Sequence, residues 1–288
     1  MYKRILLCTD GSPSAEPAGD YAIWFAKKLD ARLQVLYITD IRLLEGPWLS
    51  DISGALGAQP YAALVPKLQE LQNEKAAMVL AAAEKRCRDA GVACDTAHET
   101  GSLVPVMLDH EKHADLVVLG RHGEHAPWSP DMLGSSVERM VRGSIKPCLV
   151  TPDQFQPVKR MLIAYDGSIE SGKALHAGID LAPALEAEVA IMTVCQSRSE
   201  RNQRDNEEAA SKILNEAVQL AHDHGLKVQA QLVHGNAETE ILSLGEKGGP
   251  TLIVMGAYGH TRIRELILGS TTSHVLHKAR APVLLVRG

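Results

Sequence analysis

The sequence has few of the features that mark membrane, disulfide-rich or nucleic-acid-binding proteins. No run approaches the roughly 18 consecutive apolar residues that a membrane helix needs, and the N-terminus reaches Asp10 after only a short apolar run. The five cysteines form no C-x-x-C pair, and the net charge of -5 comes without a dense stripe of Lys and Arg. We therefore expect no membrane span, signal peptide, disulfide framework or zinc finger, no nucleic-acid partner, and a cytoplasmic location.

The length and the apolar content are those of a globular protein with two domains. The chain has 288 residues, about two domains at roughly 150 residues each, and 45% of them are hydrophobic. That proportion is sufficient for buried cores. In a chain of this length, similarity between the two halves decides the fold, since a missed repeat leads to the wrong fold.

Three segments of the first half return in the same order in the second half. KRILLCTDGS, which starts at Lys3, returns as KRMLIAYDGS from Lys159. HADLVVLGRHG returns as PTLIVMGAYG, and KPCLVTP returns as APVLLVRG. The first copy has about 20 additional residues, between Asp40 and Tyr61. The chain is therefore predicted to contain two copies of one domain, over residues 1–152 and 158–288, joined by the connector PDQFQP.

Within each copy, short runs rich in Val, Ile and Leu alternate with longer segments of helical period. This alternation predicts two tandem, doubly wound α/β domains, each with a five-stranded parallel sheet covered on both faces. Ser12 and Ser168 are the expected caps of the first helix of each copy. The expected elements of the first copy are strands near 3–9, 32–39, 92–98, 115–120 and 147–151, and helices near 13–29, 61–90, 102–112 and 135–143.

Two turns that leave strands carry candidate binding residues, because ligands of open parallel sheets gather beyond the carboxyl ends of the strands. The first turn is Asp-Gly-Ser, which begins at Asp10 and again at Asp166. The second follows the fourth strand: Gly256 to Thr271 has two glycines three apart, nine intervening residues, and then Gly-Ser-Thr at the start of a helix. Glycines allow close approach of the backbone, and a helix N-terminus favours an anion. The second copy therefore carries a predicted phosphate-binding loop.

The first copy departs from this spacing. Ten residues instead of nine separate Gly123 from the next glycine, and they include Glu124 and Asp131. Two carboxylates would repel a triphosphate unless a metal intervened, although Arg121 and His122 could still attract an anion. The expected site of the first copy is weaker, and its residues are Asp10, Gly120, Gly123, Gly134, Ser135 and Ser136.

With an Asp after strand one and a G-x2-G-x9-G-[ST] loop, each copy resembles a universal stress protein domain, and the resemblance covers nearly the entire chain. It implies a nucleotide-binding fold whose members with a complete loop commonly bind ATP in a cleft between the two turns. Asp166 would then meet the adenosine end, and Ala164 and Val194 would border the adenine. The implied nucleotide-binding residues are Ala164, Asp166, Val194, Met255, Gly256, Gly259, His260, Gly269, Ser270 and Thr271.

The resemblance also implies an assembly. The last strands, Pro147 to Thr151 and Pro282 to Arg287, would pair across a pseudo-twofold axis, so that one chain equals the usual homodimer of the family. A further homodimer and a Mg²⁺ ion beside the ATP are left open. We expect a cytoplasmic stress-response protein that binds ATP as a regulatory ligand, chiefly in the second domain.

Other interpretations of the same residues remain open. Asp10 and Asp166 could serve only their own turns, and the Walker-like stretch from Gly167 has Ala174 in place of the Mg²⁺-binding hydroxyl. The sequence contains no G-x-S-x-G nucleophile motif and identifies no general base beside the loop, so turnover is not expected. The alternatives are a slow ATPase and a nucleotide-free scaffold. The histidine pairs His110/His113, His222/His224 and His274/His277 lack the partners of a metal site.

The additional segment of the first copy is rich in apolar residues, among them Leu43, Trp48 and Ile52. So many apolar side chains in an apparent loop are expected to be covered by another surface. We predict an interface or a flap over a cleft there.

Overall fold

The computed structural model describes residues 2–42, 60–123, 133–195, 203–248, 251–257 and 268–287. The additional segment with Leu43, Trp48 and Ile52 lies outside these residues, so its predicted role as an interface or flap stays a prediction. Among the helices of the described part of the chain, none combines the length and the apolar character that crossing a bilayer requires.

The first half of the chain alternates strands and helices in the predicted order. Its elements are β1 (Arg4–Thr9), a 3-10 turn (Pro13–Ala15), α1 (Glu16–Leu29), β2 (Arg32–Asp40), α4 (Pro60–Ala90), β3 (Cys94–Gly101), α5 (Leu103–His110), a second 3-10 turn (Glu111–His113), β4 (Leu116–Gly120), α6 (Ser135–Gly143) and β5 (Cys148–Thr151). The strand expected at 92–98 begins and ends slightly later. The helix expected at 102–112 is divided into α5 and the 3-10 turn.

The second half repeats the same order of elements. They are β6 (Arg160–Ala164), α7 (Ile169–Leu185), β7 (Glu188–Cys195), α8 (Gln203–Asp223), β8 (Val228–His234), α9 (Ala237–Glu246), β9 (Thr251–Gly256), α10 (Ser270–Lys278) and β10 (Val283–Val286).

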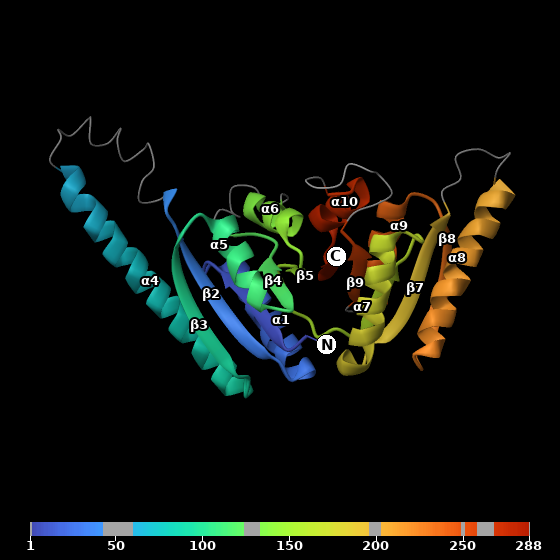
Figure 1. Ribbon diagram of the computed structural model, residues 1–288, viewed down its shortest axis with the longest axis horizontal. Coiled ribbons are helices and arrows are strands. Elements are labelled where there is room, and N and C mark those ends of the chain that lie inside the picture. Colours follow the sequence, from blue (N-terminus) through green and yellow to red (C-terminus); the bar gives the residue numbers. More distant parts are fainter. Residues whose placement is uncertain are drawn as a thin grey trace.

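All ten described strands form one continuous sheet in the order β3-β2-β1-β4-β5-β10-β9-β6-β7-β8. Neighbouring strands within each half are parallel, which confirms the predicted doubly wound α/β class. At the centre, β5 pairs with β10 antiparallel, with Leu149 opposite Leu284. Figure 1 shows the two halves on either side of this pair, with α4 along one outer end of the sheet and α8 along the other.

Two apolar layers cover the sheet. One lies between the strands and α1, α4, α7 and α8, and includes Ile5, Phe25 and Ile163 among its fully buried residues. The other lies under α5, α6, α9 and α10, and includes Leu6 and Met140. Successive strand residues point to opposite faces, so buried strands with both faces covered give the near-continuous apolar runs seen in the sequence.

One expectation about helix caps is wrong. Ser168 caps α7, because its Oγ accepts a hydrogen bond from the Ser171 N–H at 3.2 Å. Ser12 stands at the same place in the first copy, but its hydroxyl caps nothing. The Ala15 N–H donates instead to the main-chain oxygen of Ser12 at 2.9 Å, which forms the 3-10 turn before α1. The Ala15 N–H, which the Ser12 hydroxyl would have accepted as a cap, is therefore already bonded to the Ser12 carbonyl.

Candidate functional site

Four candidate residues of the second half lie at or just after the carboxyl ends of β6, β7 and β9: Ala164, Asp166, Val194 and Met255. β6 is the central strand, with β7 on one side and β9 on the other. The chain order reverses between β6 and β9, and such a switch point is where open α/β sheets bind ligands. In the first half, β1 and β4 form the corresponding edge.

The Asp-Gly-Ser turn has the same local structure in both copies. One carboxylate oxygen of Asp166 accepts the Ser168 N–H at 3.0 Å, and that of Asp10 accepts the Ser12 N–H at 2.9 Å. The glycine between them has a positive φ in each copy, +78° at Gly167 and +71° at Gly11, which favours glycine. The carboxylates therefore hold their own turns, as the structural interpretation of these residues predicted.

Gly256 is the point where the second half brings its separate segments together. A Cβ added to Gly256 would lie 2.8 Å from the carbonyl carbon of Glu170 and 3.0 Å from the Ser171 nitrogen. The end of β9 is thus packed directly against the first turn of α7. From the other side, the Thr272 hydroxyl of α10 donates to the Gly256 carbonyl at 3.1 Å. Two helix N-termini therefore converge on one glycine.

The helix α10 begins with the predicted phosphate-binding residues. Gly269 stands at its N-cap with φ -57° and ψ 147°, and glycine has no side chain of its own to cap this end. Ser270 is exposed and Thr271 is half-buried. Unpaired N–H groups in a first helical turn are donors for an anion. Gly259 and His260, predicted to follow the phosphates, lie outside the described residues.

The apolar candidates Ala164, Val194 and Met255 share one face of the sheet. All three pack in or against the apolar layer under α9 and α10. They come from the last residues of three neighbouring strands, because β6 pairs with both β7 and β9. On the opposite face of the sheet, where Tyr165 packs against the other apolar layer, burial and the negative charges of Glu216 and Asp166 raise the pKa of its phenol.

The first half assembles a looser version of this arrangement. A Cβ added to Gly120 would be 3.4 Å from the Ser14 carbonyl oxygen, and one added to Gly123 would be 3.0 Å from Asp10 Oδ2. The Asp10 turn and the loop after β4 are therefore adjacent. Gly134, the N-cap of α6, donates to the Arg121 carbonyl at 3.0 Å. Ser135 and Ser136 open that helix as predicted, with Val137 next.

Arg121 and His122, which could attract an anion, make contacts within the protein that the sequence does not predict. Arg121 is 8% exposed and donates from Nη2 to the Ala279 carbonyl, at the C-terminal end of α10 in the other half. Burial lowers the pKa of its guanidinium, while Asp153 opposes that shift. His122 Nδ1 lies 2.9 Å from Asp153 Oδ1. The sequence signal for this contact is an arginine directly after an apolar strand. The sequence does not indicate its partner, because Ala279 is 158 positions away.

The other sequence candidates have ordinary structural surroundings. The Walker-like stretch forms the Asp-Gly-Ser turn and the first turns of α7. His224 and His277 contact main-chain oxygens four residues earlier, Leu220 at 2.8 Å and Ser273 at 2.7 Å. Among the residues that the structure describes, no three His, Cys, Asp or Glu side chains gather as a metal site would require.

The fold and the repeated order of elements define a class of protein, a tandem pair of doubly wound α/β domains. The sequence model of the universal stress protein family matches this chain twice, over residues 1–152 and 157–287. The chain belongs to the universal stress protein family.

Individual relatives agree with this assignment. Universal stress protein Slr1230 of Synechocystis sp. is 38% identical over 295 residues, covering 99% of this chain and 100% of that protein. Universal stress protein YxiE of Bacillus subtilis is 32% identical and matches 44% of this chain with 98% of its own length. A crystal structure of a universal stress protein from Archaeoglobus fulgidus has the same fold, with a TM-score of 0.72 at 19% identity over 99% of this chain and 96% of that one.

Proposed function

We propose that this protein binds ATP as a regulatory ligand in the stress response, chiefly in its second domain. The triphosphate would lie at the end of β9, against the first turns of α7 and α10. Ala164, Val194 and Met255 would form the apolar floor of the site, and the adenine would lie on it.

The observation that carries the proposal is the convergence at Gly256. Glu170 and Ser171 of α7 lie within about 3 Å of its added Cβ, and Thr272 of α10 donates to its carbonyl. Both helices direct the positive ends of their dipoles toward this point, and each N-terminus favours an anion. The resemblance of the glycine loop to that of ATP-binding family members is our reason for proposing the triphosphate as the anion.

The first test is mass spectrometry of the small molecules released when the purified protein is denatured. We expect ATP or ADP near one equivalent per chain. Gly269→Val is the site variant: a side chain at the N-cap of α10 would obstruct the phosphates, while its φ of -57° is acceptable to valine. The matched control is Gly134→Val, at the same place on α6 with φ -57°.

The two variants separate the outcomes. Loss of nucleotide in Gly269→Val with retention in Gly134→Val supports a second-domain site. The opposite pattern would place the nucleotide in the first domain and overturn the proposal. An empty wild-type protein that also fails to bind ATP at millimolar concentration would favour the scaffold alternative. ADP production that disappears in Gly269→Val would instead favour the slow ATPase.

The assembly is part of the same proposal. We infer that the antiparallel β5–β10 pair lets one chain stand for the two subunits of a family homodimer, with one strong and one weak site. We also place the protein in the cytoplasm. Sedimentation of the purified chain would test the first point, since a single-chain mass is expected.

A further inference from the structure

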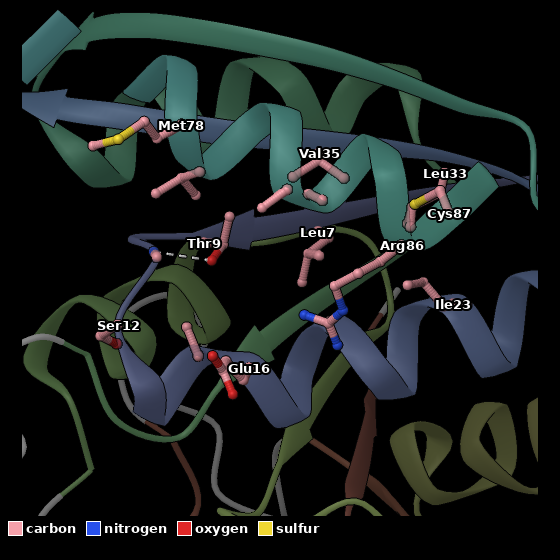
Figure 2. Close-up of a pocket in the computed structure, with 16 residues that line it drawn as sticks. Leu7, Thr9, Ser12, Glu16, Ile23, Leu33, Val35, Met78, Arg86 and Cys87 are labelled. Carbon is pink, nitrogen blue, oxygen red and sulfur yellow. Dashed lines mark hydrogen bonds between the residues drawn. The ribbon is translucent and has the colours of Figure 1, made fainter. Parts of the chain in front are cut away.

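A cavity in the first domain lies between α1 and α4 and over β1 and β2, and one end of it reaches Gly11 and Ser12 of the first Asp-Gly-Ser turn. Its volume is about 240 Å³. Figure 2 shows apolar side chains of the strands, such as Leu7, Leu33 and Val35, between the two helices. The cavity belongs to a different domain from the proposed nucleotide site, so the inference below does not depend on that proposal.

The repeat explains why this space is open. Val79 of α4 and Ile213 of α8 each contact the glycine of their own Asp-Gly-Ser turn, at Gly11 and Gly167, which aligns the two helices. On that alignment Arg86 corresponds to Leu220. In the same way Gly19 of α1 corresponds to Leu175 of α7, because both lie nine residues after the Asp of the turn.

The second domain fills the matching space with larger side chains. Leu175 is 1% exposed, and Leu220 and Tyr165 pack against the same apolar layer. In the first domain, Gly19 and Thr9 stand at the places of Leu175 and Tyr165. A close-packed interior does not leave a gap of this size without a structural reason. Here the reason is a glycine and a threonine where the other copy has a leucine and a tyrosine.

One end of the cavity carries a positive charge. Figure 2 shows Arg86 extending from α4 toward α1. Its Nη2 donates to Asp20 Oδ1 at 2.6 Å, and its Nη1 lies 3.2 Å from the position of an added Gly19 Cβ. The guanidinium has five N–H donors in a fork that suits carboxylates. Because the Arg86 side chain is 40% exposed, its guanidinium can bind an anionic head group while both charges keep part of their hydration.

The other polar lining groups lie toward the start of α1. Thr9 Oγ1 accepts the Gly11 N–H at 3.2 Å, so it already holds the turn. Ser12 Oγ has no hydrogen-bond partner within the described part of the chain. Glu16 is exposed in the first turn of α1, where a negative charge is stabilised by the helix dipole. Among the lining residues, Arg86 carries the one positive charge.

We propose that this cavity binds a medium-chain aliphatic carboxylate, with the hydrocarbon between α1 and α4 and the carboxylate at Arg86. A cavity of 150 Å³ holds a benzene molecule, so a volume of about 240 Å³ accommodates about ten non-hydrogen atoms. Octanoate has that size. A longer chain would have to extend into solvent or force the helices apart.

The test is isothermal titration calorimetry of the full chain with butanoate, hexanoate, octanoate, decanoate and dodecanoate, below their micellar concentrations. Affinity is expected to increase about three- to fourfold per methylene up to octanoate and then to stop increasing. Octylamine and 1-octanol report on the head group. We expect octanoate to bind at least about tenfold more tightly than either, because a charge-assisted hydrogen bond is lost in both.

Two variants place a residue of the second domain at the matching position of the first domain. Gly19→Leu introduces the leucine that α7 carries and fills the cavity; only the flexible end of Arg86 lies near the new Cβ. Octanoate binding should decrease more than tenfold while the melting temperature stays the same or increases, since leucine favours a helix over glycine. Arg86→Leu should keep the dependence on chain length but remove the preference for octanoate over 1-octanol.

Gly172→Leu, in the first turns of α7 with no atom within 4 Å of its added Cβ, is the matched control and should bind octanoate like wild type. Equal octanoate affinity in wild type and Gly19→Leu would overturn the cavity as the binding site. Tighter binding of octylamine than of octanoate would overturn the carboxylate. Affinity that increases steadily through dodecanoate would indicate non-specific partition.

Discussion

The two halves of this chain share a fold and a turn, but they differ in how closely their segments pack at two places. In the second half, β9 packs so closely on α7 that Gly256 has no room for a Cβ, and Thr272 joins α10 to the same point. In the first half the corresponding contacts are looser, with Gly120 in place of Gly256 and Val137 in place of Thr272.

Between the covering helices the first half is again the less tightly packed one. The first half leaves a cavity of about 240 Å³ beside Gly19, where the second half places the buried Leu175. The comparison indicates that a duplicated domain can keep its sheet and its turns while the packing of the helices around them changes. Four predictions test this difference between the halves, from the largest expected effect to the smallest.

Gly256→Ala and its counterpart Gly120→Ala should differ most. The new methyl group at residue 256 would lie 2.8 Å from the carbonyl carbon of Glu170, so the backbone must move. We expect a loss of about 2–3 kcal/mol in the free energy of unfolding. At residue 120 the nearest atoms are carbonyl oxygens at 3.3 and 3.4 Å, and the expected loss is about 1 kcal/mol or less. Urea unfolding measures both.

Gly172→Ala provides the reference for that comparison. No atom lies within 4 Å of its added Cβ, and its position in α7 should make the substitution stabilising by about 0.5–1 kcal/mol. Equal losses in Gly256→Ala and Gly120→Ala would mean that the two edges are packed alike, and the distinction between the halves would be lost.

The second prediction concerns contacts that join the halves. Arg121 donates to the Ala279 carbonyl at the end of α10, and Arg287 donates to the Arg142 and Ser144 carbonyls at the end of α6. A cation at a helix C-terminus is stabilising. Arg121→Met should cost about 1–3 kcal/mol, because it leaves a buried carbonyl without this partner.

Arg287→Met should cost less than Arg121→Met, because Arg287 is only half-buried. Amide hydrogen exchange distinguishes the two variants. Faster exchange in α10 for Arg121→Met and in α6 for Arg287→Met is expected, whereas uniform acceleration through both halves would contradict local capping.

The third prediction exchanges one residue between the copies. Thr272→Val removes the hydroxyl that donates to Gly256 and should cost about 1 kcal/mol, since Thr272 is 3% exposed. Val137→Thr, the reciprocal change at a half-buried position, should alter stability by about 0.5 kcal/mol or less. Thermal unfolding of both variants checks the difference, and equal effects would show that the hydroxyl does not connect α10 to β9.

The architecture could be predicted from the sequence because it depends on local patterns. Alternating apolar runs located the strands, and Asp-Gly-Ser located the turns in both copies. The contacts that distinguish the halves depend on distant segments. Thr272 is 16 positions from Gly256, and Arg121 is 158 positions from Ala279, so no local pattern indicates either contact.

A glycine inside a helix also does not show from the sequence what its position packs against. Gly19 resembles Gly172 in that both interrupt a helix of their own copy, and an isolated glycine is tolerated there at a modest cost. Only the helix packed against it shows that Gly19 borders a cavity, whereas Gly172 has no atom within 4 Å of its added Cβ.

The last prediction tests the one motif that the copies share letter for letter. Ser168→Ala removes the cap on the Ser171 N–H and should cost about 1 kcal/mol. Ser12→Ala should cost nothing or stabilise slightly, because the buried Ser12 hydroxyl has no hydrogen-bond partner among the described residues and the Ala15 N–H already donates to the Ser12 carbonyl. Pro13 follows Ser12 and starts the 3-10 turn, whereas Ile169 follows Ser168 and starts a regular α-helix. Chemical denaturation of the two single variants measures the difference in the free energy of unfolding directly. A larger loss for Ser12→Ala than for Ser168→Ala would show that the Ser12 hydroxyl, and not the Ser168 hydroxyl, is the stabilising cap.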